Sequence, residues 1–228
     1  MKIKICGMRE AANITAVAGL NPDYLGYIFY KKSPRYAGGE EFCENLSLAA
    51  GSAVKTAVFV DEEISEICRI QQLYHFGAVQ LHGNESPGFC AGLRALLPEG
   101  VQIFKAFGMK AGFDFTALDA FQPHIDFFLF DTSTAQKGGS GITFDWALLQ
   151  DYHLLTPYWL SGGMGIAEIA RALETGHLAD TLYGFDLNSK LELKPGEKDV
   201  SKVRLIMQLR DAWLAKVVAP IEIQTPKN

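Results

Sequence analysis

Eight short runs of β-branched, aromatic or other apolar residues alternate with longer amphipathic stretches along this chain, and this alternation limits the folds it can adopt. Continuous apolar runs of this length are typical of strands buried on both faces of a parallel sheet. The runs are residues 3–6, 24–29, 56–60, 78–81, 102–106, 127–130, 158–160 and 181–185. The stretches between them have the length and polarity of helices.

Strands that alternate with helices predict right-handed βαβ units and a parallel sheet. The expected helices are residues 10–19, 40–50, 63–74, 87–97, 115–121, 144–149, 166–173 and 200–216. Eight repeats within 228 residues favour an α/β fold with one closed (β/α)8 TIM barrel over an open sheet. We expect the barrel to span residues 1–216 as one domain, with residues 217–228 as a C-terminal tail.

The charge and the cysteines exclude several classes of protein. A net charge of −5 gives no reason to expect nucleic acid or a membrane as a partner. The four cysteines form no C-x-x-C pair, so we expect reduced thiols, no metal site and a cytoplasmic location. The oligomeric state is left open between monomer and homodimer. A small anionic substrate would need a local binding site, because the overall field does not attract it.

A glycine-rich segment follows the seventh run, with Gly162 and Gly163 after Ser161. Glycines let the backbone approach a phosphate closely, and the next helix points free N–H groups at the anion. Barrels often bind phosphate at the loops after strands seven and eight, so we predict a phosphate site here rather than a simple turn. The polar residues after the eighth run would supply its other half: Asp186, Asn188 and Ser189.

Cys6 and Asp131 stand at the ends of the first and sixth runs, where the active site of a barrel is built. A cysteine on an apolar strand is more often a small core residue, so position alone favours a structural role for Cys6. A catalytic thiol would need a pKa below about 8.5. Asp131 is either a loop cap or a general acid whose pKa is raised by the neighbouring apolar residues.

Other polar residues near strand ends have less specific interpretations. Arg35 can hold a planar carboxylate in two hydrogen bonds, although Lys31 and Lys32 equally suggest a solvated basic loop. His82 is interpreted as an ordered loop histidine, and Asp61 and Glu85 as caps or loop contacts.

Two further features lie outside these strand ends. Asp199 would be an N-terminal charge of the last helix. Residues 138–141 read Gly-Gly-Ser-Gly, which suits either a mobile lid or a disordered loop.

Taken together, these segments resemble the phosphoribosylanthranilate isomerase family of tryptophan biosynthesis. The resemblance rests on the order of motifs from the first strand to the last helix. They are Lys4-Ile5-Cys6-Gly7, Ser33-Pro34-Arg35, Val58-Phe59-Val60, Gln80-Leu81-His82-Gly83 with Glu85, Asp131, Gly138-Gly139-Ser140-Gly141 with Phe144 and Trp146, Ser161-Gly162-Gly163, Asp186-Leu187-Asn188-Ser189 with Glu192, and Gly196 with Lys198-Asp199.

The resemblance implies an Amadori rearrangement of N-(5-phosphoribosyl)anthranilate to 1-(2-carboxyphenylamino)-1-deoxyribulose 5-phosphate, without metal or organic cofactor. Asp131 matches the family's general acid, which opens the furanose ring to a Schiff base. Cys6 matches its general base, which removes the C2 proton. Arg35 matches the arginine that contacts the anthranilate carboxylate. The glycine loop and the Asn188-Ser189 turn match its phosphate site.

The sequence departs from the family pattern at two positions, and other functions stay open. Lys190 stands where the family usually has glycine, and Ser161 where alanine is common. Lys190 could add a charge near the phosphate or point to solvent. The alternatives are a sugar-phosphate epimerase, an indole-glycerol-phosphate synthase with Lys105 as one candidate catalytic residue, and a barrel that only binds a sugar phosphate. The presence of both Cys6 and Asp131 argues against the last.

Overall fold

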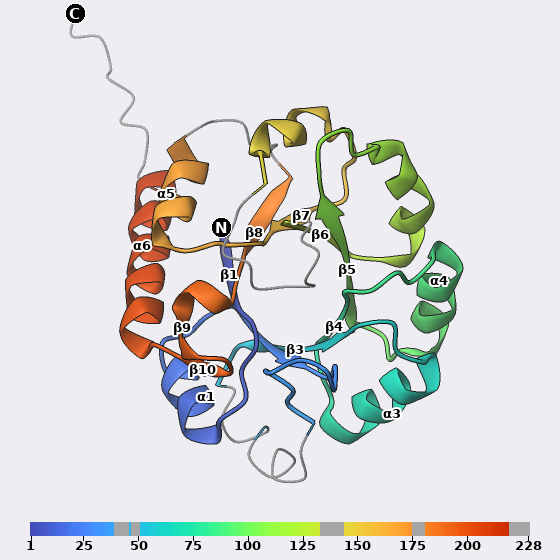
Figure 1. Cartoon of the computed structure of the whole chain (residues 1–228), viewed down its shortest axis with the longest axis horizontal. Coiled ribbons are helices and arrows are strands. Elements are labelled where there is room, and N and C mark those ends of the chain that lie inside the picture. Colours follow the sequence, from blue (N-terminus) through green and yellow to red (C-terminus); the bar gives the residue numbers. More distant parts are fainter. Residues whose placement is uncertain (39–45, 47–50, 133–143, 175–180, 219–228) are drawn as a thin grey trace, which may run out of the picture.

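Eight parallel strands close into a barrel in the computed structural model, which confirms the fold expected from the sequence (Figure 1). The structure describes residues 1–38, 46, 51–132, 144–174 and 181–218. Each strand pairs with its neighbours in chain order, and β8 pairs with β1 to close the ring. The strands are β1 Lys2–Ile5, β2 Tyr24–Ile28, β3 Val54–Phe59, β4 Ala78–Leu81, β5 Gln102–Met109, β6 Phe127–Thr132, β7 Tyr158–Leu160 and β8 Leu182–Leu187.

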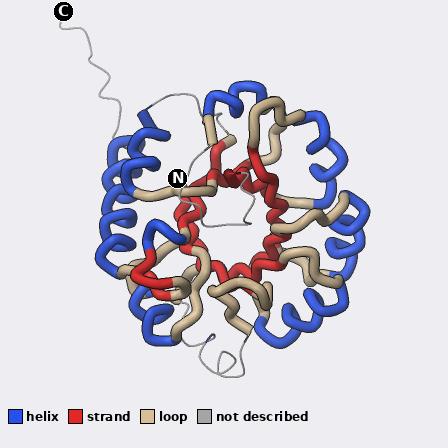
Figure 2. Tube along the Cα trace, in the orientation of Figure 1, coloured by secondary structure: helices blue, strands red, loops and turns tan. Residues whose placement is uncertain are grey.

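Helices surround the strands and cover the outer face of the barrel (Figure 2). They are α1 Ala11–Ala18, α3 Ile64–Tyr74, α4 Pro87–Leu96, η1 Phe115–His124, η2 Trp146–Asp151, α5 Ile166–Glu174 and α6 Val200–Val218. The helix expected over residues 40–50 lies outside the described residues, apart from residue 46. None of the helices in the described part of the chain is long and apolar enough to cross a membrane.

Local sequence explains where several helices begin and what form they take. Ser86 caps α4 by accepting a hydrogen bond from the backbone N–H of Phe89, and Pro87 opens its first turn. The helices expected over residues 115–121 and 144–149 are 3₁₀ helices instead of α-helices. Pro123 lies inside η1, and its missing N–H and fixed φ prevent a regular α-helix there.

Successive side chains along each strand point alternately outward and inward, which separates an outer core from the interior of the barrel. Ile3 and Ile5 of β1 pack into the large apolar cluster that lies between strands and helices. Residues of opposite parity point into the barrel. Inside, near the starts of the strands, a second apolar cluster fills the interior: Tyr24, Ala78, Phe104, Ala106, Phe127, Leu129 and Trp159.

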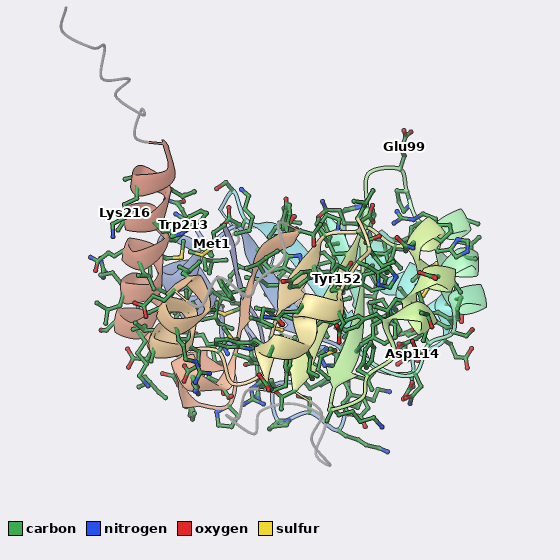
Figure 3. All side chains as sticks on the ribbon, turned by 90° about the horizontal axis from the view of Figure 1, so that it is seen from above. Met1, Glu99, Asp114, Tyr152, Trp213 and Lys216 are labelled. Atoms are coloured by element: carbon green, nitrogen blue, oxygen red, sulfur yellow. The ribbon has the colours of Figure 1, made fainter. Side chains whose placement is uncertain are left out.

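The two ends of the barrel differ in chemistry. Glu99, before β5, and Asp114, after it, mark these opposite ends in Figure 3. The apolar cluster lies toward the starts of the strands, and the polar inward-facing residues lie toward their carboxyl ends. Lys4, Gln80, Asp131 and Asp186 share the inward parity. The carboxyl end of the barrel is therefore where the predicted site residues meet.

A short hairpin after β8 was not expected from the sequence. It consists of η3 Ser189–Leu191, β9 Glu192–Lys194 and β10 Glu197–Lys198, with the two strands antiparallel. Gly196 has a φ of +88° in the connecting turn. The hairpin leads directly into α6, whose first N–H groups at Ser201 and Lys202 donate to the Asp199 carboxylate, which confirms the expected helix-terminal charge.

Candidate active site

A cavity of about 440 Å³ opens at the carboxyl ends of the strands. It is lined by all eight residues that the sequence predicts for the site. They are Cys6, Arg35, Asp131, Gly162, Gly163, Asp186, Asn188 and Ser189. The cavity is also lined by residues that were not predicted as site residues from the sequence, among them Lys32, Gln80, His82 and Ser161.

Cys6 follows β1 and is almost completely buried, with 4% of its surface exposed. Its backbone N–H donates to the carbonyl of Leu187, which continues the β1–β8 pairing. Gly26 of β2 leaves room for the thiol, since a Cβ at that position would lie 2.7 Å from the Cys6 sulfur. Burial raises the pKa of the Cys6 thiol, and the neighbouring ammonium of Lys4 opposes that rise without cancelling it.

Asp131 lies near the end of β6 and contacts His82, which we had interpreted from the sequence as an ordered loop histidine. Nε2 of His82 is 3.2 Å from Oδ2 of Asp131, and Oδ1 accepts a hydrogen bond from the N–H of Thr132 at 2.7 Å. The other ring nitrogen of His82 is 2.7 Å from Nε2 of Gln80. The carboxyl group is therefore held on both oxygens, and one of its partners can itself carry a proton.

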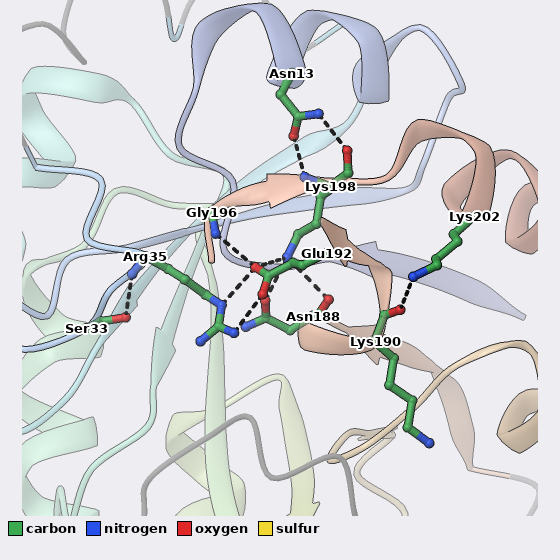
Figure 4. Close-up of polar contacts among 9 residues, drawn as sticks. All are labelled: Asn13, Ser33, Arg35, Asn188, Lys190, Glu192, Gly196, Lys198 and Lys202. Carbon is green, nitrogen blue, oxygen red and sulfur yellow. Dashed lines mark hydrogen bonds and ion pairs between the residues drawn. The ribbon is translucent and has the colours of Figure 1, made fainter. Parts of the chain in front are cut away.

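Arg35 is fixed by a carboxylate from the hairpin after β8 (Figure 4). Its Nε and Nη2 donate to the two oxygens of Glu192 at 2.8 and 2.7 Å. Such a paired bond holds the plane of the guanidinium and leaves its Nη1 edge for another acceptor. This hydrogen bonding holds the pKa of Arg35 above its ordinary value.

Lys198 joins the same network from β10 and is fully buried. Its Nζ donates to Glu192 at 2.8 Å and to the side-chain oxygen of Asn188 at 2.7 Å (Figure 4). Burial opposes the ionisation of Glu192, but the bond from Arg35 and the charge of Lys198 outweigh it and lower the pKa of Glu192. For Lys198 burial is the larger effect and lowers its pKa.

The predicted phosphate loop has the backbone that close approach to an anion requires. Gly162 and Gly163 have φ values of +81° and +63°, and α5 begins three residues later at Ile166. Left-handed φ values are unfavourable for residues with a Cβ, so both positions favour glycine. Ser161, at the start of the loop, donates from its hydroxyl to Oδ2 of Asp186 at 3.3 Å.

Lys190 lies against the end of the predicted phosphate loop, since a Cβ at Gly165 would be 3.1 Å from its Cδ. Its ammonium forms an ion pair with Oε1 of Glu168 in α5 at 2.6 Å. The pair joins the eighth loop to the helix that follows the phosphate loop. Lys190 is not among the residues that line the cavity.

Several polar residues noted in the sequence lie elsewhere. Glu85 accepts hydrogen bonds from the N–H groups of Asp61 and Gly83, which confirms its interpretation as a loop contact. Lys105, the candidate residue of the synthase alternative, pairs with Glu85, because its Nζ lies 3.0 Å from Oε2 of that residue. Neither residue of this pair lines the cavity. Residues 138–141, the possible lid, lie outside the described residues.

Lys4, Glu192 and Lys198 were present in the family motifs, but their charges were not linked to site residues from sequence. Each is charged and buried, and each contacts a predicted site residue. A charged residue placed on the inward face of a strand is the signal that could have identified Lys4. In the described part of the chain, no three His, Cys, Asp or Glu side chains are grouped so that they could hold a metal ion.

Comparison with known proteins points to one family. The family model described as N-(5'-phosphoribosyl)anthranilate isomerase matches residues 3–209. A relative named N-(5'-phosphoribosyl)anthranilate isomerase from Parabacteroides distasonis is 38% identical over 214 residues, which cover 91% of this chain and 92% of the relative.

Solved structures agree with this match. Monomers made from the dimeric phosphoribosylanthranilate isomerase of Thermotoga maritima align with a TM-score of 0.71 and 26% identity, over 93% of this chain and 98% of theirs. A further isomerase structure, in complex with reduced 1-(o-carboxyphenylamino)-1-deoxyribulose 5-phosphate, aligns with a TM-score of 0.73 and 24% identity, over 93% of this chain and 99% of that one.

Proposed function

Because the chain belongs to the N-(5'-phosphoribosyl)anthranilate isomerase family and catalyses the isomerase step of tryptophan biosynthesis, we propose that Asp131 and Cys6 carry out the proton transfers of that step. The substrate is N-(5-phosphoribosyl)anthranilate and the product is its 1-deoxyribulose 5-phosphate isomer. The observation that carries the assignment is that Asp131, Cys6, Arg35 and the glycine loop all line one cavity.

Asp131 acts first, as the general acid. Its carboxyl group donates a proton to the furanose ring oxygen, the bond from that oxygen to C1 breaks, and a protonated Schiff base forms between C1 and the anthranilate nitrogen. The support is the pairing with His82, because a second titratable group at 3.2 Å can hold or replace the proton. The Thr132 N–H orients the other oxygen of the carboxyl group.

Cys6 acts second, as the general base. The iminium of the Schiff base acidifies the proton on C2, so a thiolate suffices to remove it and leave a neutral enolamine. Conversion of the enolamine to the ketose then moves one proton from O2 to C1. The isomerisation is proton-neutral overall, because Asp131 regains the proton it gave and Cys6 releases the one it took.

Two anionic groups orient the substrate between these residues. We assign the anthranilate carboxylate to the free Nη1 edge of Arg35, which Glu192 holds in place. We assign the phosphate to Gly162 and Gly163 with Asn188 and Ser189, and Asp186 contributes by accepting the hydrogen bond from Ser161. Fixing both ends converts a mobile sugar into a near-attack geometry.

The complexed relative supports this arrangement. The name of its ligand contains a carboxyphenyl group and a 5-phosphate, the two anions that the proposal places at opposite ends of the cavity.

The oligomeric state and the location of the enzyme are also part of the proposal. We expect a monomer or a homodimer, and a relative is described as dimeric. We also propose a cytoplasmic location, which the free thiols of Cys6, Cys68 and Cys90 suit.

The test is a fluorescence assay with freshly made phosphoribosylanthranilate in the presence of a metal chelator. Wild-type protein should consume the substrate, whereas Cys6→Ala and Asp131→Asn should each lose at least about 10²-fold in kcat, the lower range for a positioned acid or base. Cys68→Ala, which changes a cysteine outside the cavity, serves as the matched control. Near-normal turnover in Cys6→Ala or Asp131→Asn would remove that residue from its role.

A further inference from the structure

A buried ion pair lies at the closing seam of the barrel. Lys4 of β1 and Asp186 of β8 are register partners in the last strand pairing, and Nζ of Lys4 lies 2.8 Å from Oδ1 of Asp186. The side chains are 0% and 5% exposed, so both charges are removed from water. Buried charges of this kind are retained in proteins only where they have partners.

Cys6 lies directly above this pair on the same strand face. Lys4 and Cys6 are two residues apart on β1, so their side chains point into the barrel on the same side. Lys4 donates to the carboxylate of Asp186 at 2.8 Å, and its positive charge lowers the pKa of the neighbouring Cys6 thiol. One ammonium thus connects the proposed base to a fixed anion.

The charges that bear on Cys6 come from four segments of the chain. Lys4 is on β1, Asp186 on β8, Lys198 on β10 and Arg35 on the loop after β2. The carboxylate of Glu192 offsets Arg35 and Lys198 by its contacts with both. Three cations therefore face two carboxylates in this cluster of described residues, and a thiolate at Cys6 would balance the remaining positive charge.

We propose that Lys4 is a positioning residue that makes Cys6 a competent base, by donating to its thiolate while Asp186 holds the ammonium in place. The inference rests on the proposed function, in which Cys6 removes the C2 proton. The role of Lys4 explains how a thiol at a buried, apolar strand end can ionise, because desolvation alone keeps a thiol protonated. Among the cations that act on Cys6, Lys4 has the largest effect, and its position is fixed by the ion pair at the barrel seam.

A purely structural role for Lys4 makes a different prediction. If the ion pair only closed the seam, the ionisation of Cys6 would not depend on it. The chain contains a comparison in Lys105, a second buried lysine, which lies on the outward-facing side of β5 and pairs with Glu85. Lys105 is not among the charges that act on Cys6.

The experiment measures the ionisation of Cys6 directly in the whole protein without substrate. The rate of alkylation by iodoacetamide is followed against pH, and peptide mass spectrometry separates Cys6 from the other three cysteines. The variants are Lys4→Met, Asp186→Asn, the double variant Lys4→Met/Asp186→Asn, and Lys105→Met as the control. The pH profile of kcat/KM is measured on the same proteins.

Lys4→Met should raise the midpoint of Cys6 alkylation by about one pH unit or more, which is the size of shift that one adjacent charge produces. At neutral pH this is about a tenfold loss of thiolate. Asp186→Asn should lower the midpoint, because it removes a negative charge, and the substituted amide oxygen can still accept the hydrogen bond that positions Lys4. Lys105→Met should leave it unchanged. The acid limb of kcat/KM should move with the alkylation midpoint.

The double variant keeps the test decisive if Lys4→Met fails to fold, because it leaves no unpaired charge. Its midpoint should lie above that of the wild type and below that of Lys4→Met, since Lys4 acts on Cys6 more strongly than Asp186 does. A midpoint at or below the wild-type value in either variant would overturn the inference. Full turnover by Cys6→Ala would instead remove Cys6 as the base and leave the alkylation result standing, so the two failures are distinguishable.

Discussion

The imidazole of His82 lies against the carboxyl group of Asp131, with Nε2 3.2 Å from Oδ2. His82 directly follows β4 and Asp131 lies in β6, and the two side chains meet at the cavity. His82→Asn should therefore lower kcat by about 10–100-fold, because a hydrogen bond to a charged group is worth about 1.5–3 kcal/mol. KM should change little, since His82 is not one of the proposed anion-binding residues.

Steady-state kinetics of His82→Asn beside His75→Asn checks this prediction. His75 is an exposed histidine in the left-handed region, where asparagine is tolerated, so the same substitution there should leave kcat unchanged. Equal kcat values in the two variants would show that Asp131 works without its histidine partner.

Gly162 packs directly on the proposed acid. A Cβ at this position would collide with Oδ1 of Asp131 and lie 2.5 Å from the Thr132 nitrogen, and the φ of +81° is itself unfavourable for alanine. Gly162→Ala should displace Asp131 and the phosphate loop together, so kcat should fall and KM should rise.

Gly112→Ala is the matched control for this substitution. Its φ is +74°, but a Cβ there meets nothing within 4 Å. Both variants should lose about 1–2 kcal/mol of stability from the left-handed backbone, as measured by urea unfolding. Loss of activity should be confined to Gly162→Ala, and parallel losses in both variants would mean that the collision is not the cause.

Glu192 determines how Arg35 presents its free edge. Glu192→Gln removes the charge from a paired hydrogen bond, so Arg35 should lose its fixed plane and KM should rise about tenfold, the lower value for a lost charged hydrogen bond. kcat should change much less. Glu197→Gln on the same hairpin alters only an exposed pair with Lys194, and its KM should match the wild type.

Glu192 also makes stability depend on pH. Its pKa is below the ordinary value of about 4.3, because the bond from Arg35 and the charge of Lys198 outweigh burial. Its ionised form therefore stabilises the fold above that ordinary pKa, and the contribution is lost as the pH falls through the folded-state pKa. The difference in free energy of unfolding between wild type and Glu192→Gln should be larger at pH 7 than near pH 4. An equal difference at both would exclude this linkage.

The strands of the barrel were predictable because their burial leaves a local signal. Every expected run overlaps a strand of the barrel, and β7 coincides with its predicted run at Tyr158–Leu160. The 3₁₀ helices η1 and η2 were expected as helical stretches, but their type depends on local contacts such as the cap at Asp145 that hydrophobic spacing does not reveal.

The site was predictable residue by residue, but its connections were not. Cys6 and Asp131 follow apolar runs, which the sequence displays directly. The contact of His82 with Asp131 depends on the barrel placing the ends of β4 and β6 on either side of β5, which the sequence does not display. The hairpin is polar in sequence, yet the side chains of Glu192 and Lys198 on it are buried, because their charges satisfy one another.

The ion pair at the seam has a consequence for the chain while it is being made. Lys4 and Asp186 are separated by 182 positions, so their contact cannot form until β8 has left the ribosome. Until then Cys6 is an ordinary cysteine with a pKa of about 8.5 and little thiolate at neutral pH. Folding then buries this thiol, which raises its pKa, and closure of the barrel brings in Lys4, whose charge opposes that rise, at the same time as the cavity encloses the sulfur.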